Sequence, residues 1–478
     1  MRLIPALRAV ALLGCLLAEG CAVGPTFQRP KSPADAAYAN LPNAQLDAQK
    51  VVPGADIPAE WWTLFHSPAL DTLVRRAIAA NPDLAAARAA LRQAQELAKA
   101  DRGAFLPNVG LEASTTRARN PGVLASPLES NSNLYTLTTA QLNVGYTLDL
   151  FGGIRRQAES SAALAEAQRF QTEAAYLTLT SNVVVAAITE ASLRDQIAAT
   201  QKSIAAQARI LDIMRGRLRL GDLARADIAA QQTLLAQTEQ SLPPLQKQLA
   251  QQRDLIAALA GQMPVSEQPR VDLASLSLPQ NLPLSLPARL VDQRPDVRAA
   301  EANLHAASAQ VGVAIAARLP AITLSGSGGG AATNFATLLA PENVLWSVVG
   351  GLTAPLFDGG TLRHRQRAAE AAYDQAKAQY RGAVLAAFQN VSDTLAAIDN
   401  DTNGLRAAER AERAAADSLA IAQGQSRLGA VAPLQVLNAE QAYWQTSLTL
   451  QQARAALYAD NAALFQALGG GWWHRVAD

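Results

Sequence analysis

Two stretches of this chain carry an apolar side chain at every seventh residue, and the second stretch repeats the first 208 residues later. The first stretch places them at Ile228, Leu235, Leu242, Leu249 and Ile256. The second stretch places them at Val436, Tyr443, Leu450, Leu457 and Leu464. An unbroken heptad pattern is typical of helices that pack side by side as coiled coils. The chain therefore has to accommodate the same long helix twice.

A longer helical segment precedes each heptad stretch, again at an offset of 208 residues. Residues 154–216 would extend about 90 Å if they were helical throughout. Short turns that contain glycine, Leu220-Gly221 and Leu428-Gly429, then lead into the heptad stretches. Glycine accepts the left-handed conformation that ends many helices. We therefore predict an antiparallel pair of long helices in each half of the chain.

Strand-like alternation occurs between the helical segments. From residue 141 to residue 150, Leu, Val and Tyr alternate with Asn, Gly, Thr and Asp. This period of two predicts a strand with one apolar face and one water-facing face. Gly-Gly pairs at 152–153 and 359–360 end such segments in both halves. Glycine allows the backbone to turn from strand into helix, and this is the simplest role for these pairs. A phosphate-binding loop would need a fuller sequence signature than two glycines.

The duplication divides the chain into a leader, two copies, a linker and a tail. Residues 1–20 are a predicted signal peptide, and residues 21–60 are a predicted lipid-anchored, extended N-terminal segment. The first copy covers residues 61–262 and the second covers residues 288–470. A linker rich in proline and serine occupies residues 263–287, and residues 471–478 form a C-terminal tail.

Each copy is expected to contain a helix, two strands and two long helices. In the first copy, the strands are predicted at 106–117 and 136–151, and the long helices at 154–216 and 222–261. In the second copy, the strands are predicted at 319–331 and 344–357, and the long helices at 361–426 and 431–468. One chain would therefore have four strands of the membrane type.

The first twenty residues have the organisation of a secretory signal peptide. Arg2 and Arg8 form a basic region, and residues 9–18 form an apolar region of signal-peptide length. Gly20 before Cys21 matches the small residue that precedes the cysteine of bacterial lipoproteins. We therefore expect covalent lipid on Cys21, as N-palmitoyl and S-diacylglycerol groups, and no other cofactor.

The processing site has two alternatives. Glu19 stands where a small apolar residue is usual, and Cys15 could serve instead, although it would shorten the apolar region. A plain secretory signal with two incidental cysteines is the other alternative. No cysteine follows residue 21, so we expect no disulfide framework in the mature chain.

Charge and residue spacing argue against several functional classes. The 41 basic and 40 acidic residues nearly cancel, so no nucleic acid partner is indicated. The four histidines are scattered and lack metal-ligand spacing: His66, His305, His364 and His474. The sequence has no recognisable Ser-His-Asp signature. We therefore expect neither an enzyme nor a metal site.

Four strands with one apolar face cannot close a barrel, and open sheet edges are not tolerated in lipid. Three chains would supply twelve strands, an even number within the range of outer-membrane barrels. A lipid anchor, a small barrel and very long helices together indicate a duct that runs from the outer membrane into the periplasm.

The sequence resembles the outer-membrane efflux protein (TolC-like) family, in its lipoprotein branch often called NodT-type. The resemblance rests on CAVGPTFQRP at 21–30, on RPDVRAAE at 294–301 with its echo from Asn81, on the twin strand–Gly-Gly–helix passages, and on LGGGW at 468–472. It implies a mainly α homotrimer. Its twelve-stranded β-barrel, with four strands per chain, would continue into a long α-helical periplasmic tunnel.

The resemblance also implies a function and its partners. The protein would be the exit duct of a tripartite efflux pump in the outer membrane. It would work with a periplasmic adaptor protein and with an inner-membrane pump, commonly of the resistance–nodulation–division type. Small toxic compounds or drugs would pass through it, and the sequence does not specify which.

Two sets of site residues follow from the resemblance. The helical turns would form the periplasmic tips that contact the adaptor, at Leu220, Gly221, Leu223, Leu428, Gly429 and Val431. The family also has a ring of acidic residues at the closed aperture, but the matching positions here are Gln435 and Asn438, and only Asp227 of the first copy is acidic. We expect these three residues to narrow the pore without concentrated negative charge. We expect Asp227 to pair with an arginine such as Arg225 or Arg427.

Two other functions remain open for such a chain. The helices alone would suit a non-conducting periplasmic scaffold, but a scaffold has no need of lipid-facing strands. The same duct could serve protein secretion, although the lipoprotein branch favours efflux.

Overall fold

The computed structural model describes residues 22–31, 49–124, 132–221, 223–284 and 287–475. The predicted signal peptide and Cys21 lie outside the described residues. The chain forms two compact units. Met1–Pro30, Leu91–Gln168 and Ala300–Tyr380 make up the first unit, and Lys31–Ala90, Arg169–Ala299 and Arg381–Asp478 make up the second. Each unit contains segments of both copies, so the copies are interleaved and are not separate domains.

Four pairs of equivalent elements in the two copies have equal lengths. The 22-residue helices are α3 (Pro82–Gly103) and α7 (Pro295–Ala316), and the 12-residue strands are β2 (Asn108–Arg119) and β5 (Ala321–Ala332). The 67-residue helices are α4 (Gly153–Arg219) and α8 (Thr361–Arg427), and the 35-residue helices are α5 (Arg225–Leu259) and α9 (Pro433–Ala467). The long helices start 208 residues apart (361 − 153 and 433 − 225), which is the offset of the heptads. The predicted internal duplication is confirmed.

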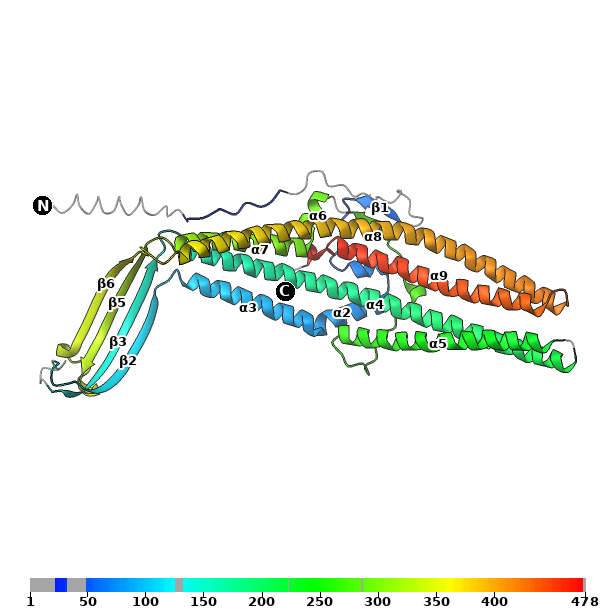
Figure 1. The fold of residues 1–478 in the computed structure, drawn as a ribbon, viewed down its shortest axis with the longest axis horizontal. Coiled ribbons are helices and arrows are strands. Elements are labelled where there is room, and N and C mark those ends of the chain that lie inside the picture. The colour runs from blue at the N-terminus through cyan, green and yellow to red at the C-terminus, as the bar shows by residue number, and fades with distance from the viewer. Residues whose placement is uncertain (1–21, 32–48, 125–131, 222, 285–286, 476–478) are drawn as a thin grey trace. The chain divides into compact units, whose positions relative to one another are not determined.

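The first unit contains an antiparallel sheet of four strands in the order β2-β3-β5-β6, where β3 covers Leu134–Leu148 and β6 covers Val344–Thr353 (Figure 1). Leu111 pairs with Leu142, and Leu142 pairs with Gly328. Gly328 in turn pairs with Trp346. Paired residues share one face of a sheet, so this register decides which side chains lie together.

The two faces of this sheet differ in chemistry. One face carries Val109, Leu111, Leu142, Val144, Tyr146, Leu148, Ile322, Leu324, Trp346, Val348 and Leu352. The other face carries Glu112, Gln141, Asn143, Thr147, Thr323, Ser325, Ser327 and Ser347, with Tyr135, Leu137, Leu345 and Val349 as exceptions. On the polar face, the Asn143 amide donates a hydrogen bond to Glu112, and the Ser327 and Ser347 hydroxyls lie 2.9 Å apart.

An aromatic cluster forms the core of the second unit. It starts in the 3-10 helix η1 (Trp61–Phe65), where Trp61 stacks on Phe465 of α9 with ring centroids 5.3 Å apart. Trp62 contacts Tyr176 of α4, and its indole N–H donates to Asp71 of α2 (Pro68–Ala80). Trp61, Trp62 and Phe465 are at most 1% exposed. One short turn therefore ties α2, α4 and α9 to a common core.

The predicted linker at 263–287 contains regular structure. Its residues include the 3-10 helix η2 (Leu273–Ser275) and strand β4 (Asn281–Leu284). Strand β4 pairs in parallel with β1 (Lys50–Pro53), which lies inside the predicted extended N-terminal segment. Leu282 and Leu284 of β4 are buried. A two-stranded sheet has only edge strands, which tolerate the proline that made this stretch resemble a linker. Helix α6 (Pro287–Gln293) follows.

Prolines and helix caps set the strand ends. Strands β2 and β5 begin just after Pro107 and Pro320, and β6 ends before Pro355 although its prediction extended to residue 357. Proline has no N–H group for strand pairing. Strand β3 ends at Leu148, three residues before the predicted end, because Asp149 accepts hydrogen bonds from the Ile154 and Arg155 N–H groups at the start of α4, both of 3.0 Å.

Helix α4 is the one described helix that is long and apolar enough to cross a membrane by length and composition. However, 67% of its most apolar window is buried inside the chain. The core helix of a soluble protein has the same properties, so this feature is weak evidence for a membrane span.

Candidate functional site

The four-stranded sheet has two open edges, formed by β2 and β6. Within the described residues, each of these strands pairs with one neighbour only, so its outer N–H and C=O groups have no strand partner in a single chain. On the apolar face, Leu111, Trp346 and Val348 are each more than 75% exposed. Lipid tolerates such a sheet only when it closes on itself, so the edges have to pair with other copies.

The first described residues dock against the first unit through their backbone. The Val23 N–H donates to the carbonyl of Phe151, and the Arg156 guanidinium donates to the carbonyl of Val23, at 3.0 and 3.1 Å. A Cβ atom on Gly24 would overlap the backbone of Gly312 in α7. Gly24 also has a φ of 94°, which favours glycine. This segment is thereby fixed beside the junction between β3 and α4.

Side-chain contacts continue this docking toward residue 30. The Phe27 ring stacks on His305 with centroids 4.4 Å apart, and the Arg29 guanidinium lies 2.9 Å from the Glu301 carboxylate. His305 Nε2 lies 2.8 Å from Glu159 Oε1. Burial acts to raise the pKa of Glu159, but hydrogen bonds from His305 and then Arg156 hold this pKa below its ordinary value. The role of His305 is therefore structural.

The predicted adaptor-contacting residues lie at the two turns between long helices. Leu220 is 79% exposed and Leu428 is 85% exposed. Gly221 and Gly429 have φ angles of 85° and 72°, the left-handed conformation that lets each chain reverse. A leucine therefore projects into solvent beside each turn, and a partner can contact both without displacing other side chains.

Leu223 and Val431 differ from these leucines. Leu223 packs against a buried cluster formed by Leu211, Met214 and Ile228. Val431 is half-buried. Leu223 therefore stabilises the first turn from inside and presents little of its side chain to a partner. The sequence did not indicate this, because both residues lie in short irregular segments without periodicity.

A groove that the sequence did not predict lies next to these turns. Its volume is about 480 Å³, and residues of α4, α5, α8 and α9 line it together with Leu223. Arg209 and Arg217 of α4 and Arg427 of α8 give it three positive charges, while Ile213 and Val436 supply apolar contact area. We call this feature the tip groove. A partner that binds there has to present acidic or polar groups beside apolar ones.

The predicted aperture residues lie in the first turn of α5 and the first two turns of α9. Asp227 Oδ2 accepts a hydrogen bond from the Ala224 N–H at 3.2 Å, which satisfies a free donor at the start of α5. Among the described residues of a single chain, Asp227 forms no ion pair with Arg225 or Arg427, so the expected pairing stays a prediction for the trimer. Gln435 and Asn438 are both exposed and lie three residues apart on α9.

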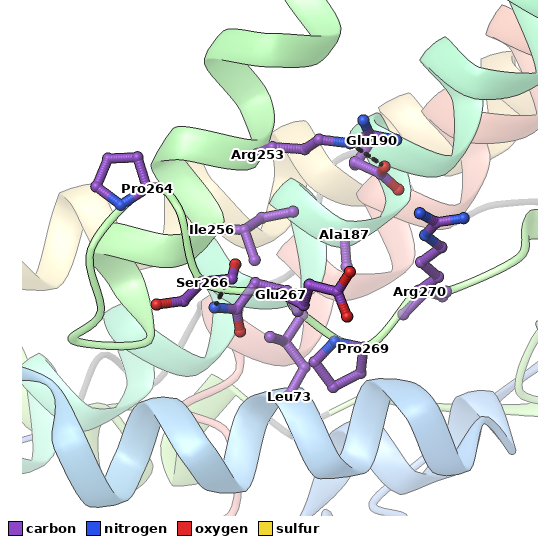
Figure 2. A pocket seen from close by; sticks show the side chains of 12 residues that line it. Leu73, Ala187, Glu190, Arg253, Ile256, Pro264, Ser266, Glu267, Pro269 and Arg270 are labelled. Carbon is purple, nitrogen blue, oxygen red and sulfur yellow. Dashed lines mark hydrogen bonds and ion pairs between the residues drawn. The ribbon is translucent and has the colours of Figure 1, made fainter.

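A cavity of about 290 Å³ lies between α2, α4, α5 and residues 264–271 (Figure 2). Its central carboxylate, Glu190, is 6% exposed and accepts hydrogen bonds from Arg194 at 2.9 Å and from Arg253 at 3.1 Å. Arg194 also reaches Asp272 at 2.9 Å and the carbonyl of Val271. These charges neutralise one another. They hold the segment after α5 in place and leave no excess charge for a ligand.

Comparison with known proteins agrees with this geometry. The model of the outer membrane efflux protein family matches residues 73–262 and 286–470. A pyoverdine export outer membrane protein, OpmQ, of Pseudomonas putida is 33% identical over 86% of this chain and 88% of its own length. Nodulation protein T of Rhizobium leguminosarum is 27% identical, with 96% of each chain covered. The solved structure of the outer-membrane channel OprN has a TM-score of 0.84 and 29% identity, over 95% of this chain and 100% of that one.

These findings confirm the predicted resemblance and fold class. They also confirm the location in the outer membrane and the role as the channel component of an efflux system with an adaptor and an inner-membrane pump. The matched regions span both copies and include the sheet, the long helices and the turns. The chain belongs to the outer membrane efflux protein family.

Proposed function

We propose that three copies of this chain form a passive exit duct for small molecules. The sheet carries the proposal, because it combines an exposed apolar face, a polar face and two open edges. Pairing β2 of one copy with β6 of the next gives twelve strands. The polar face, with Glu112 and Ser327, then lines a water-filled lumen. The proposal gives no residue a catalytic role.

A cysteine cross-linking experiment tests the barrel. The mature chain has no cysteine beyond residue 21, so Leu111→Cys in β2 can be combined with Val344→Cys, Trp346→Cys or Val348→Cys in β6. At the correct register, oxidation of membranes should give a covalent ladder that ends at the trimer. Leu142→Cys in the central strand β3, combined with the same partners, is the control and should give no ladder. The barrel model fails if no β2–β6 pair cross-links.

We infer that the adaptor docks at the turns around Leu220, Gly221, Leu428 and Gly429, and in the adjoining tip groove. The exposed leucines and the arginines of the groove support this inference. Leu223 and Val431 belong to the same surface, although Leu223 contributes from inside. Leu428→Glu should abolish cross-linking to the adaptor while trimers persist in gel filtration. Met263→Glu changes another exposed apolar residue and should leave cross-linking intact.

We propose that Cys21 carries the lipid anchor. The docking of Val23 and Gly24 beside the strand-to-helix junction supports this, because a lipid on the preceding residues would then start close to the membrane-spanning sheet. Cys21→Ala should abolish the incorporation of radioactive palmitate, and Cys15→Ala should leave it unchanged. Labelling that depends on Cys15 would contradict the assignment.

We propose that Asp227, Gln435 and Asn438 narrow the periplasmic aperture. Two amides replace the acidic ring, so millimolar divalent or trivalent cations should not block the conductance of purified trimers in planar bilayers. The variant with Gln435→Asp and Asn438→Asp should become sensitive to these cations. If cations block the conductance of the wild type and of the variant equally, Gln435 and Asn438 do not line the aperture.

The cargo is proposed to be small. A relative named for pyoverdine export supports small-molecule efflux over protein secretion as the function of this duct. Deletion of the gene should sensitise cells to small amphiphilic toxicants and leave the profile of secreted proteins unchanged. A changed secretion profile with unchanged susceptibility would favour the alternative.

A further inference from the structure

Glu440 of α9 is a buried carboxylic acid without a hydrogen-bond partner. Its residue is 5% exposed. Neither carboxyl oxygen has a hydrogen-bond partner in the described part of the chain. A charged carboxylate in this condition is costly to bury, and most buried polar groups in folded proteins are satisfied. The surroundings of Glu440 therefore have to explain why an acid stands there.

Glu440 lines a cavity of about 440 Å³ within the second unit. Three helices form the walls: Asp195 and Lys202 come from α4, Gln423 from α8, and Tyr443 and Trp444 from α9. The Trp444 indole lies 3.5 Å from the Thr200 hydroxyl of α4, which fixes the aromatic wall. The volume is within the range of sites for small organic molecules.

The charges in this cavity do not balance. Among the lining residues, Asp195 and Glu440 contribute −2 and the exposed Lys202 contributes +1. Arg194 and Arg454 act on Asp195 from outside the lining. Burial raises the pKa of Glu440 to about 7, although the Gln423 side chain, which makes no well-formed hydrogen bond to it, still acts as a weak donor and lowers this pKa. Burial also raises the pKa of Asp195. A cation placed between them would offset the cost of ionising these two buried carboxyl groups.

The lining selects an organic cation over a metal ion. Divalent ions take six or more oxygen ligands, usually with several carboxylates. No cluster of three or more His, Cys, Asp or Glu side chains suitable for a metal occurs among the described residues. In contrast, Tyr443 and Trp444 offer aromatic faces, which attract ammonium groups and apolar surface together.

We propose that this cavity binds an organic monocation whose ammonium group pairs with Glu440 and whose apolar part contacts Tyr443 and Trp444. The inference goes beyond the proposed function, because a passive duct needs no binding site in its helical wall. The position 208 residues earlier is Gln232, which is exposed and neutral. The first copy therefore lacks the central acid of this site.

Calorimetric titration of purified trimers with benzylammonium at pH 8 tests the proposal. The wild-type trimer should bind one ligand per chain, and Glu440→Gln should weaken binding at least tenfold. Benzyl alcohol, which is neutral and of similar shape, should bind at least tenfold more weakly to the wild type. Glu239→Gln removes an exposed carboxylate of α5 and is the control for charge, so its affinity should equal that of the wild type.

The Lys202→Met variant tests whether Lys202 competes with the proposed ligand for Glu440. Removal of this competing cation should strengthen benzylammonium binding. The proposal is overturned if the wild type does not bind at millimolar ligand, if Glu440→Gln binds equally well, or if benzyl alcohol binds as tightly. Gel filtration should show intact trimers for every variant, and the conductance of Glu440→Gln should match that of the wild type. The result for this site is therefore independent of the duct itself.

Discussion

The two long helix pairs, α4/α5 and α8/α9, have equal lengths but different buried polar groups. In the first pair, Glu190 is held by Arg194 and Arg253. The positions 208 residues later are Ile398, Thr402 and Asn461. Ile398 is fully buried, and the Asn461 side-chain carbonyl accepts a hydrogen bond of 2.7 Å from Gln49. An ion triad in one copy has become an apolar contact and a neutral hydrogen bond in the other.

At a second position, the buried acid is in the second helix pair and the neutral residue is in the first. The second pair buries the unpartnered Glu440 where the first has the exposed Gln232. The second pair also has Gln451 and Gln452 where the first has Pro243 and Pro244. The Gln452 amide donates a hydrogen bond to Gln196 of α4. The heptad stripes thus maintain the length and packing of both pairs, while polar positions between the stripes diverge and can acquire separate roles.

The largest effect is expected from breaking the ion triad of the first pair. Glu190→Ile should destabilise the trimer by about 3 kcal/mol per chain, because it removes the buried acceptor of two charged hydrogen bonds, while Arg194 keeps Asp272 and Arg253 is half exposed. The triple variant Glu190→Ile, Arg194→Thr and Arg253→Asn gives the first pair the residues of the second and should recover most of this loss. Thermal unfolding followed by circular dichroism measures both. Equal losses in the single and triple variants would show that the two copies are not interchangeable at these positions.

A smaller, pH-dependent effect is expected at Glu440. Its pKa of about 7 lies above the ordinary value of 4.5, so the folded chain holds a proton that the unfolded chain releases between these values. Stability should therefore fall as the pH rises from about 4.5 to 7 and stay low above pH 7. Glu440→Gln should stabilise the trimer by about 2–3 kcal/mol per chain at pH 8 and by little at pH 4.5. Gln232→Glu places an acid at the exposed equivalent and should add no such pH dependence.

The smallest effect is expected at the start of the return helices. Asp227→Ala should cost about 1 kcal/mol, because it removes the carboxylate at the N-terminus of α5. Gln435→Ala, at the equivalent position of α9, should cost less than about 0.5 kcal/mol because Gln435 is exposed and makes no such cap. Chemical denaturation of both variants measures the difference. Equal costs would mean that the two turns are stabilised in the same way.

Much of the fold could be predicted because short local patterns determine it and because both copies contain these patterns. Heptads such as Ile228–Leu235 and glycines such as Gly221 act within one or two helical turns, and the second copy repeats them. Strand β4 could not be predicted, because its four residues are too few for a period and its partner β1 lies some 230 residues away.

The site residues were harder to predict than the fold. Glu440 lies between the heptad positions Val436 and Tyr443, where an acid is ordinarily solvent-exposed, and only the packing of three helices reveals its burial. Asp227 was expected to pair with an arginine, but within the chain it accepts a hydrogen bond from the backbone N–H of Ala224, which needs no ordering of a long side chain. The positions of Leu223 and of the tip groove depend on how α4, α5, α8 and α9 approach one another, which no local pattern encodes.

The close approach of Gly24 and Gly312 has a mechanical consequence. Three residues of chain span at most about 10 Å, so the lipid proposed on Cys21 would be attached within that distance of Gly24, and therefore close to α7. Such a short connection would allow little movement of the lipid relative to α7. In a trimer, three such attachments would resist tilting and axial movement of the barrel in the membrane.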